Sequence, residues 1–176
     1  MYIASTRFTN ETLEENNKYR ESRNISGRIY GSGIKINEKY PLNCWMFVVE
    51  MNNSINQIEG IGVIRNMVVG DKYYRIYSNN NYNRYIYKGK YWLSRAQISD
   101  LNPELVEIFE KILFKGKSNL KRISGISVVT EKLFNRWEYN HNIILRQVKQ
   151  MFIESFRSDQ EQDQHQEIIS DLIQNI

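Results

Sequence analysis

The pattern of apolar and polar positions predicts several strands in the first part of the chain. Alternation predicts a short strand over residues 2 to 8. Residues 44 to 51 (CWMFVVEM) are apolar on both alternating faces up to Glu50, which is typical of a central strand covered on both sides. After a polar turn, residues 57 to 66 alternate again, so they predict the antiparallel hairpin partner of that strand.

Two less regular segments accompany these strands. The polar residues 10 to 24 predict either a solvated helix capped by Thr12 or an ordered loop. Residues 26 to 36 contain the spacing GSG among isoleucines and a tyrosine. A phosphate-cradling loop would need a Lys-Ser or Lys-Thr pair and a following helix, and this segment has neither. A bent or bulged strand is therefore favoured.

The stretch from residue 72 to 95, KYYRIYSNNNYNRYIYKGKYWLSR, holds seven of the twelve tyrosines together with six cations. It predicts a strand over residues 73 to 78, an asparagine loop, and a second strand that begins near Arg84. The second strand either turns at Lys88 and Gly89 into a further hairpin or continues straight. In the straight case the tyrosines gather on one face and most of the cations on the other.

Helical signals dominate the second half of the chain. Residues 103 to 114 carry a buried stripe at helical spacing, with Asn102 as N-cap and Pro103 in the first turn. Residues 131 to 156 predict a longer helix with a similar stripe. Between the two helices an acid-free basic loop, KGKSNLKR, is predicted to lead into a strand over residues 125 to 129.

These elements predict one α+β domain over residues 1 to 157: a mixed, largely antiparallel sheet, curled or forming a partial barrel, and flanked by the two main helices. Residues 158 to 176 are predicted to form an acidic, flexible tail with a short amphipathic end. The length of 176 residues suits one domain better than two.

The net charge of +4 hides a division along the chain. The last 19 residues carry five acids and neither lysine nor arginine, so the preceding 157 residues carry +9. A basic body indicates a polyanionic partner. The acidic tail is predicted either to screen that body or to contact another basic surface, and its amphipathic end to bind a protein partner or a second copy.

Targeting signals and cysteine usage favour an intracellular protein. No apolar run is long enough to span a membrane and the N-terminus lacks a secretory leader, so no membrane partner is expected. Cys44 is the only cysteine and lies within an apolar run, which predicts a core residue that cannot form an intrachain disulfide. A reducing compartment fits this usage.

Motifs for catalysis are absent from the sequence. His141 and His165 are the only histidines and neither CxxC nor HExxH occurs, so no metal site is expected. There is no GxSxG, no Walker motif and no GxGxxG between a strand and a helix, so no cofactor is expected. The sequence favours a non-enzymatic protein and leaves open a hydrolase built on scattered carboxylates such as Glu50 and Glu59.

The leading hypothesis is therefore a nucleic-acid-binding protein. The tyrosine-rich stretch offers rings that can stack on bases, and the basic loop offers cations that can meet phosphates. RNA or another single strand is favoured over duplex DNA. The predicted nucleic-acid-binding residues are Arg84, Lys88, Lys90, Tyr91, Trp92, Lys115, Lys117, Lys121 and Arg122. The alternative is a structural or assembly protein that acts through protein contacts, since tyrosine is also enriched at protein interfaces.

The order of the elements resembles that of a known family. The segments CWMFVVE and IEGIGVI, followed by aromatic strands and flanking helices, resemble PUA-like β-barrel domains of the EVE and YTH type over residues 1 to 130. The resemblance implies recognition of RNA or of a modified base in an aromatic pocket. Candidate pocket residues are Trp45, Tyr85 and Tyr87, together with Tyr91 and Trp92.

The composition gives a further expectation about the source. Its richness in Asn, Ile, Tyr and Lys looks like that of proteins from large cytoplasmic DNA viruses. This similarity implies a viral protein in the host cytoplasm or in a virion, and for the alternative function it implies a component of a viral particle.

Overall fold

Strand β3 (Trp45–Asn52) forms the centre of the fold. The computed structural model describes residues 1–157, and seven of the eight residues of β3 are buried. β3 runs parallel to β1 (Tyr2–Phe8) and antiparallel to β4 (Gln57–Arg65), so the predicted hairpin is confirmed. β6 (Trp92–Ser94) lies beside β4, and β7 (Ser127–Val128) lies beside β1.

The resulting sheet is mostly antiparallel and is not closed into a barrel. Its strand order is β6-β4-β3-β1-β7, and the β1–β3 pair is the parallel one. The prediction of a mixed, largely antiparallel sheet in an α+β fold is confirmed. β7 is shorter than the strand predicted over residues 125 to 129, since its pairing with β1 covers Ser127 and Val128.

Four helices come from the described residues of the second half of the chain, up to residue 157. They are α2 (Arg95–Leu101), α3 (Pro103–Phe114), α4 (Glu131–Asn135) and α5 (His141–Phe156). α3 is the helix predicted at that position. The side-chain oxygen of Asn102 accepts a hydrogen bond of 3.3 Å from the Leu105 amide, so the predicted N-cap is also confirmed.

Two helical predictions need correction. α2 was missed because it is short and buries one apolar side chain, Ile98; a capping box between Ser94 and Gln97 begins it. The single helix predicted over residues 131 to 156 is two helices. Glu138 has a left-handed φ of 62°, which ends the first helical segment. Asn140 then caps α5 by accepting hydrogen bonds from two backbone amides.

The polar segment after β1 is a helix, α1 (Asn10–Glu21), and its cap differs from the predicted one. Thr9 is the N-cap: its hydroxyl accepts a hydrogen bond of 3.3 Å from the Thr12 amide, and the Thr12 hydroxyl accepts one of 2.9 Å from the Thr9 amide. Asn16 is the buried residue of this helix. It donates hydrogen bonds to the Ile29 carbonyl (2.8 Å) and the Tyr77 hydroxyl (2.9 Å), which fixes α1 to its neighbours.

The tyrosine-rich stretch folds differently from either prediction. Residues 73 to 78 do not form a strand, because the Ile76 and Tyr77 amides donate to the side-chain oxygen of Asn83 at 3.0 Å instead of to a neighbouring strand. A 3-10 turn, η1 (Asn80–Asn83), follows. The predicted second strand is β5 (Tyr85–Gly89), but it pairs with β2 (Arg28–Ser32) in a separate two-stranded sheet. β5 and β6 therefore form neither a hairpin nor one straight strand.

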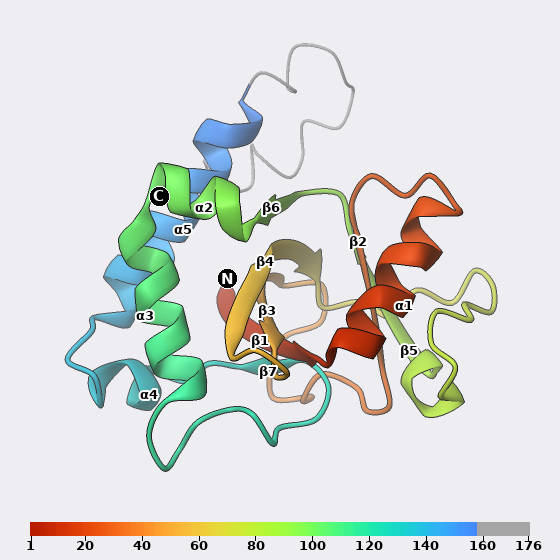
Figure 1. The fold of residues 1–176 in the computed structure, drawn as a ribbon, viewed down its shortest axis with the longest axis horizontal. Helices are drawn as coiled ribbons and strands as arrows, with labels where there is room; N and C mark the ends of the chain where they lie inside the picture. Colours follow the sequence, from red (N-terminus) through yellow and green to blue (C-terminus); the bar gives the residue numbers. More distant parts are fainter. Residues whose placement is uncertain (158–176) are drawn as a thin grey trace.

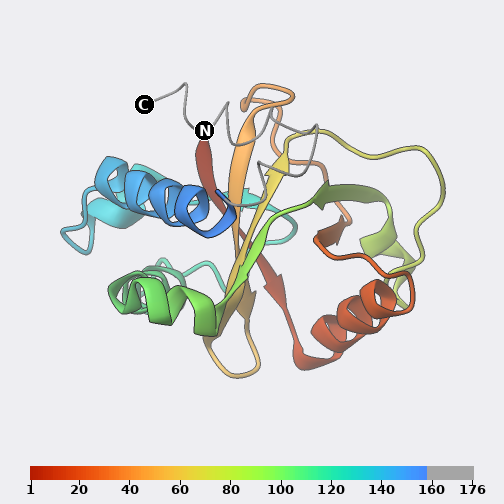
Figure 2. The same ribbon diagram turned by 90° about the horizontal axis from the view of Figure 1, so that it is seen from above.

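The elements form three layers (Figures 1 and 2). Helices α2 to α5 cover one face of the large sheet, and α1 with the β2–β5 sheet covers the other. Because successive residues of β3 point to opposite faces, Phe47 belongs to the core under the helices and Met46 to the core under the small sheet. No helix among residues 1–157 is long and apolar enough to cross a membrane. The predicted tail, 158 to 176, lies outside the described residues.

Candidate functional site

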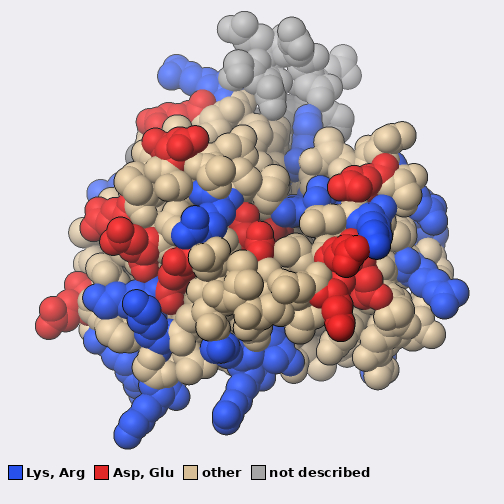
Figure 3. Space-filling view, in the orientation of Figure 1, with Lys and Arg blue, Asp and Glu red and all other residues tan. Residues whose placement is uncertain are grey.

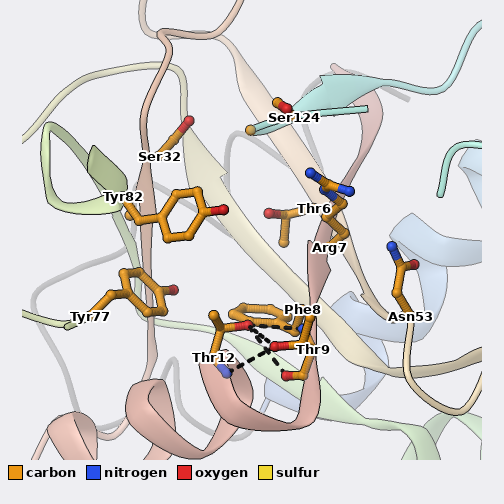
Figure 4. Close-up of a pocket in the computed structure, with 12 residues that line it drawn as sticks. Thr6, Arg7, Phe8, Thr9, Thr12, Ser32, Asn53, Tyr77, Tyr82 and Ser124 are labelled. Carbon is orange, nitrogen blue, oxygen red and sulfur yellow. Dashed lines mark hydrogen bonds between the residues drawn. The ribbon is translucent and has the colours of Figure 1, made fainter. Parts of the chain in front are cut away.

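A cavity of about 150 Å³ opens where β1 ends and α1 begins, facing β2 and η1 (Figure 4). A volume of roughly this size accommodates a single aromatic ring. Segments far apart in the sequence meet there. The lining residues are Thr6, Arg7, Phe8, Thr9, Thr12, Gly31, Ser32, Asn53, Tyr77, Tyr82, Ser124 and Gly125.

Gly31 allows the two tyrosines of this pocket to lie against β2. A Cβ atom at Gly31 would be 2.3 Å from the Tyr82 carbonyl oxygen and 2.8 Å from the Tyr77 ring. The two rings contact each other edge to face, with centroids 6.0 Å apart. The glycine-rich segment is thus a strand, as predicted, and one of its glycines is required for a close approach rather than for a bend.

The two tyrosines have different roles in the pocket wall. Tyr77 is 3% exposed and its hydroxyl accepts the Asn16 hydrogen bond. Burial raises the pKa of the Tyr77 phenol well above its ordinary value, so this ring is a fixed neutral wall. Tyr82 is 40% exposed, and Figure 4 shows its hydroxyl pointing across the cavity toward Thr6. Tyr82 is therefore the ring that a ligand can reach.

Polar groups on the opposite side tie the pocket to the basic loop. Arg7 donates a hydrogen bond of 3.0 Å to the Lys121 carbonyl, and the Asn53 side-chain amide donates to the same oxygen at 2.8 Å. The side-chain oxygen of Asn53 is buried and accepts no hydrogen bond from residues 1–157. This oxygen is out of reach of a ligand in the cavity, and leaving it unpaired costs free energy.

Ser124 and Gly125, which directly follow the basic loop, line the pocket. No acid occurs between Glu110 and Glu131, and Lys115, Lys117 and Arg122 are exposed while Lys121 is half-buried. Lys and Arg side chains project from the lower edge of the molecule in Figure 3, where Figure 1 places this loop. Arg84 is exposed directly after η1, the turn that carries Tyr82. Five of the predicted nucleic-acid-binding residues therefore lie on segments that adjoin the pocket, although none of them lines it.

The other predicted nucleic-acid-binding residues lie elsewhere. Figure 1 shows the connection from β5 to β6 at the opposite edge of the molecule from the basic loop. Lys88 contacts the Tyr74 hydroxyl, and Lys90 lies 5.6 Å from the centre of the Tyr91 ring. Tyr91 is 6% exposed and packs on Phe156, so it has no free face for a base.

Trp92 also packs against a buried side chain. Its half-buried indole lies 3.8 Å from the Arg28 guanidinium carbon, measured to the ring centre. This contact places a cation on the face that was predicted to stack on a base.

The predicted base-pocket residues are not gathered in this cavity. Tyr87 is 1% exposed and its hydroxyl accepts a hydrogen bond from the Ile36 amide, so it is a core residue. Tyr85 is half-buried, with the Lys35 ammonium 5.7 Å from its ring. Trp45 is half-buried, with the Arg65 guanidinium 4.1 Å from its ring.

Sequence reasoning missed Arg7, Asn53 and the pairing of Tyr77 with Tyr82. Both tyrosines belong to the stretch that was singled out, yet their exposure depends on the irregular path of residues 73 to 78. Arg7 has one usable signal, since it is the one charged residue of its strand and lies near the strand's end. Asn53 has none, because asparagines are common in all the turns of this chain.

Groups for metal binding are not assembled in the described part of the chain. Residues 1–157 contain no cluster of three or more His, Cys, Asp or Glu side chains that could hold a metal ion. Comparison with known proteins adds no assignment: no family model, no curated protein and no solved structure matches this chain.

Proposed function

We propose that the protein binds single-stranded nucleic acid, with RNA as the favoured partner, by enclosing one base in the Tyr77–Tyr82 pocket and holding the adjoining phosphates on the basic loop. The observation that carries this proposal is that Lys121 joins the two parts: its carbonyl accepts hydrogen bonds from Arg7 and Asn53 of the pocket, and its side chain belongs to the loop. The backbone of the basic loop is therefore joined to the wall of a ring-sized cavity.

The dimensions of the pocket favour a base from an unpaired strand. Pockets for drug-sized molecules usually measure roughly 300–1,000 Å³, whereas this cavity is about 150 Å³. A base within a duplex is stacked and paired, so it would first have to leave the helix. An unpaired base can enter directly and stack on the exposed Tyr82 ring.

The PUA-like relationship belongs to the same proposal. The features that support it are the apolar central strand, its hairpin partner, and an aromatic pocket of base size. The resemblance implies a modified or unmodified base as the enclosed group, and in this chain the pocket rings are Tyr77 and Tyr82 in place of the predicted Trp45, Tyr85 and Tyr87.

Titration of labelled single-stranded RNA, single-stranded DNA and duplex DNA at several salt concentrations tests the proposal. We expect about micromolar or tighter binding of the single strands at low salt, weakening as salt rises. Replacing the exposed ring, Tyr82→Ala, should cost about five- to a hundredfold in affinity. Tyr73→Ala is the matched control, because Tyr73 is 67% exposed and lies outside the pocket. Absence of binding at low salt contradicts the proposal.

A second candidate function is assembly with other proteins. Leu42 and Met67 are 85% and 57% exposed, and the neighbouring residues Asn43 and Asn66 are joined by a backbone hydrogen bond of 3.0 Å. Two large apolar side chains are thus held close together on the surface. Measuring the oligomeric state of Leu42→Ser/Met67→Ser, and of a chain without residues 158 to 176, tests this candidate.

A further inference from the structure

A second hollow lies on the other side of the loop that borders the base pocket. It is an open groove of about 570 Å³ between α3, the β3–β4 turn and the segment before α5. Its lining residues are Asn56, Glu107, Glu110, Lys111, Phe114, Lys115, Lys121 and Tyr139. None of the predicted base-stacking residues is among them.

The groove and the pocket share one wall. Asn53 lines the pocket and Asn56 lines the groove, and both belong to the turn between β3 and β4. Lys121 lines the groove and gives its carbonyl oxygen to Arg7 and Asn53 on the pocket side. The two hollows are therefore separated by the width of this turn and one residue of the basic loop.

The charge of the groove suits a phosphate backbone. Lys111, Lys115 and Lys121 contribute three cations. Of the two carboxylates, Glu110 is already engaged: it accepts hydrogen bonds from Arg95 Nε at 3.1 Å and from the Ile58 amide at 3.3 Å. Glu107 remains as the one carboxylate of the lining without such a bond among the described residues, so the balance of the groove is positive.

Aromatic rings accompany these cations. The Lys111 ammonium lies 5.0 Å from the centre of the Trp137 ring and 5.5 Å from that of Tyr139, so it braces both rings. Tyr139 and Phe114 are half-buried and line the groove. A ring held at the edge of a cationic groove is the arrangement on which a base can stack while its phosphate meets a lysine.

We infer that this groove is a second subsite, in which Tyr139 stacks a base that flanks the one enclosed by Tyr77 and Tyr82, while the linking phosphates cross Lys121. The inference rests on the proposed function, since both subsites bind one nucleic-acid strand. An acidic segment of a protein is the other occupant that three lysines could attract. The shared wall favours the nucleic-acid strand, because a strand bound in the pocket already lies next to Lys121.

A series of single-stranded RNAs of increasing length tests the inference. Wild-type protein should gain affinity at the length that reaches the groove, and Tyr139→Leu should abolish that gain. We expect Tyr139→Leu to bind long RNA about five- to a hundredfold more weakly and the shortest RNA equally well. Tyr139→Phe is the matched control: it keeps the ring and should retain the gain. Thermal unfolding checks that both variants are folded.

The outcomes separate the inference from the proposed function. Equal binding of every length by wild type and Tyr139→Leu overturns the second subsite and leaves the pocket intact. If Tyr82→Ala loses RNA binding and Tyr139→Leu does not, the second subsite is likewise overturned. A poly-glutamate peptide that binds the wild type and not Tyr139→Leu, with RNA affinity unchanged by the substitution, overturns it in favour of an acidic protein partner. Failure of all RNAs to bind overturns both.

Discussion

Arg28 and Glu50 form an ion pair in the interior that joins the two sheets. Arg28 Nε lies 2.9 Å from one carboxylate oxygen of Glu50, and Nη2 donates a hydrogen bond of 2.9 Å to the other. The side chains are 4% and 1% exposed. The Tyr30 hydroxyl donates a further bond of 2.7 Å to Glu50. The acid that interrupts the apolar pattern of β3 thus connects β3 to β2.

Removing one member of this pair should strongly destabilise the fold. Arg28→Met leaves the Glu50 carboxylate buried without its cation, and a broken buried pair typically costs about 3–5 kcal/mol. Burial already raises the pKa of Glu50, and the Arg28 charge opposes that rise. We therefore expect Glu50 to become protonated in the variant. Urea unfolding monitored by tryptophan fluorescence measures the loss.

The exposed pair Glu14–Lys18 provides the control for this experiment. Its atoms are 2.6 Å apart, but both side chains are more than half exposed. Glu14→Gln should leave the urea midpoint unchanged within error, since exposed pairs contribute little. Equal midpoints for Arg28→Met and Glu14→Gln would mean that the interior pair does not support the fold.

The parts of the fold that the sequence predicted are those in which local pattern and final environment agree. β3 was predicted from a continuous apolar run and β4 from apolar alternation, and both patterns are properties of the residues themselves. α3 was predicted because Asn102, Pro103 and a buried stripe occur together. Residues 73 to 78 are rich in the tyrosine and isoleucine that favour strands, yet they are not a strand. Their amides bond to Asn83, and no local pattern records that partner.

The candidate site was only partly predictable for a related reason. The loop cations were recognised because a run without acids is visible in the sequence. The exposure of each tyrosine depends on which distant element packs on it: Tyr87 meets the Ile36 amide and Tyr91 meets Phe156. The pocket combines side chains from β1, β2, a turn and a loop, and because β1 and β2 belong to different sheets, their proximity follows from how the layers pack.

Gly31→Ala should damage the pocket and the fold together. The new Cβ would lie 2.3 Å from the Tyr82 carbonyl oxygen, so η1 has to move away from β2. We expect a loss of about 1–3 kcal/mol in the free energy of unfolding, as for other overpacked sites, and weaker RNA binding. Gly70→Ala is the control, because a Cβ atom added at Gly70 would meet no other atom within 4 Å. Wild-type stability of Gly31→Ala would show that β2 and η1 separate at little cost.

Alkaline pH should unfold the protein through its buried tyrosines. Burial raises the pKa of Tyr74 to about 12, and the pKa values of Tyr30 and Tyr77 are raised for the same reason. The unfolded chain ionises these phenols near their ordinary pKa of about 10, so ionisation stabilises the unfolded state at a lower pH than it stabilises the folded state. The folded state therefore loses stability as the pH rises through the interval from about 10 to about 12.

Urea midpoints measured from about pH 9 to about pH 11 check this dependence. The ultraviolet absorbance of phenolate should rise together with the loss of structure. Tyr77→Phe keeps the ring and removes one of the raised phenols, so its midpoint should fall less steeply over the same interval. A midpoint that stays constant up to about pH 11 would contradict the assignment of these phenols to the interior.

The basic loop should be measurable through the salt dependence of binding. Each phosphate contact with a single strand contributes about 0.7 to the slope of log affinity against log salt. Lys117 and Arg122 are both exposed, so Lys117→Gln/Arg122→Gln should lower the slope by about 1.4 while stability stays unchanged. Lys39→Gln is the matched control, because Lys39 is exposed before the start of β3, at the opposite end of that strand from the turn beside the pocket. An equal change of slope in Lys39→Gln and in the loop variant would mean that the strand follows no defined path, and that the positive charge of the whole body attracts it.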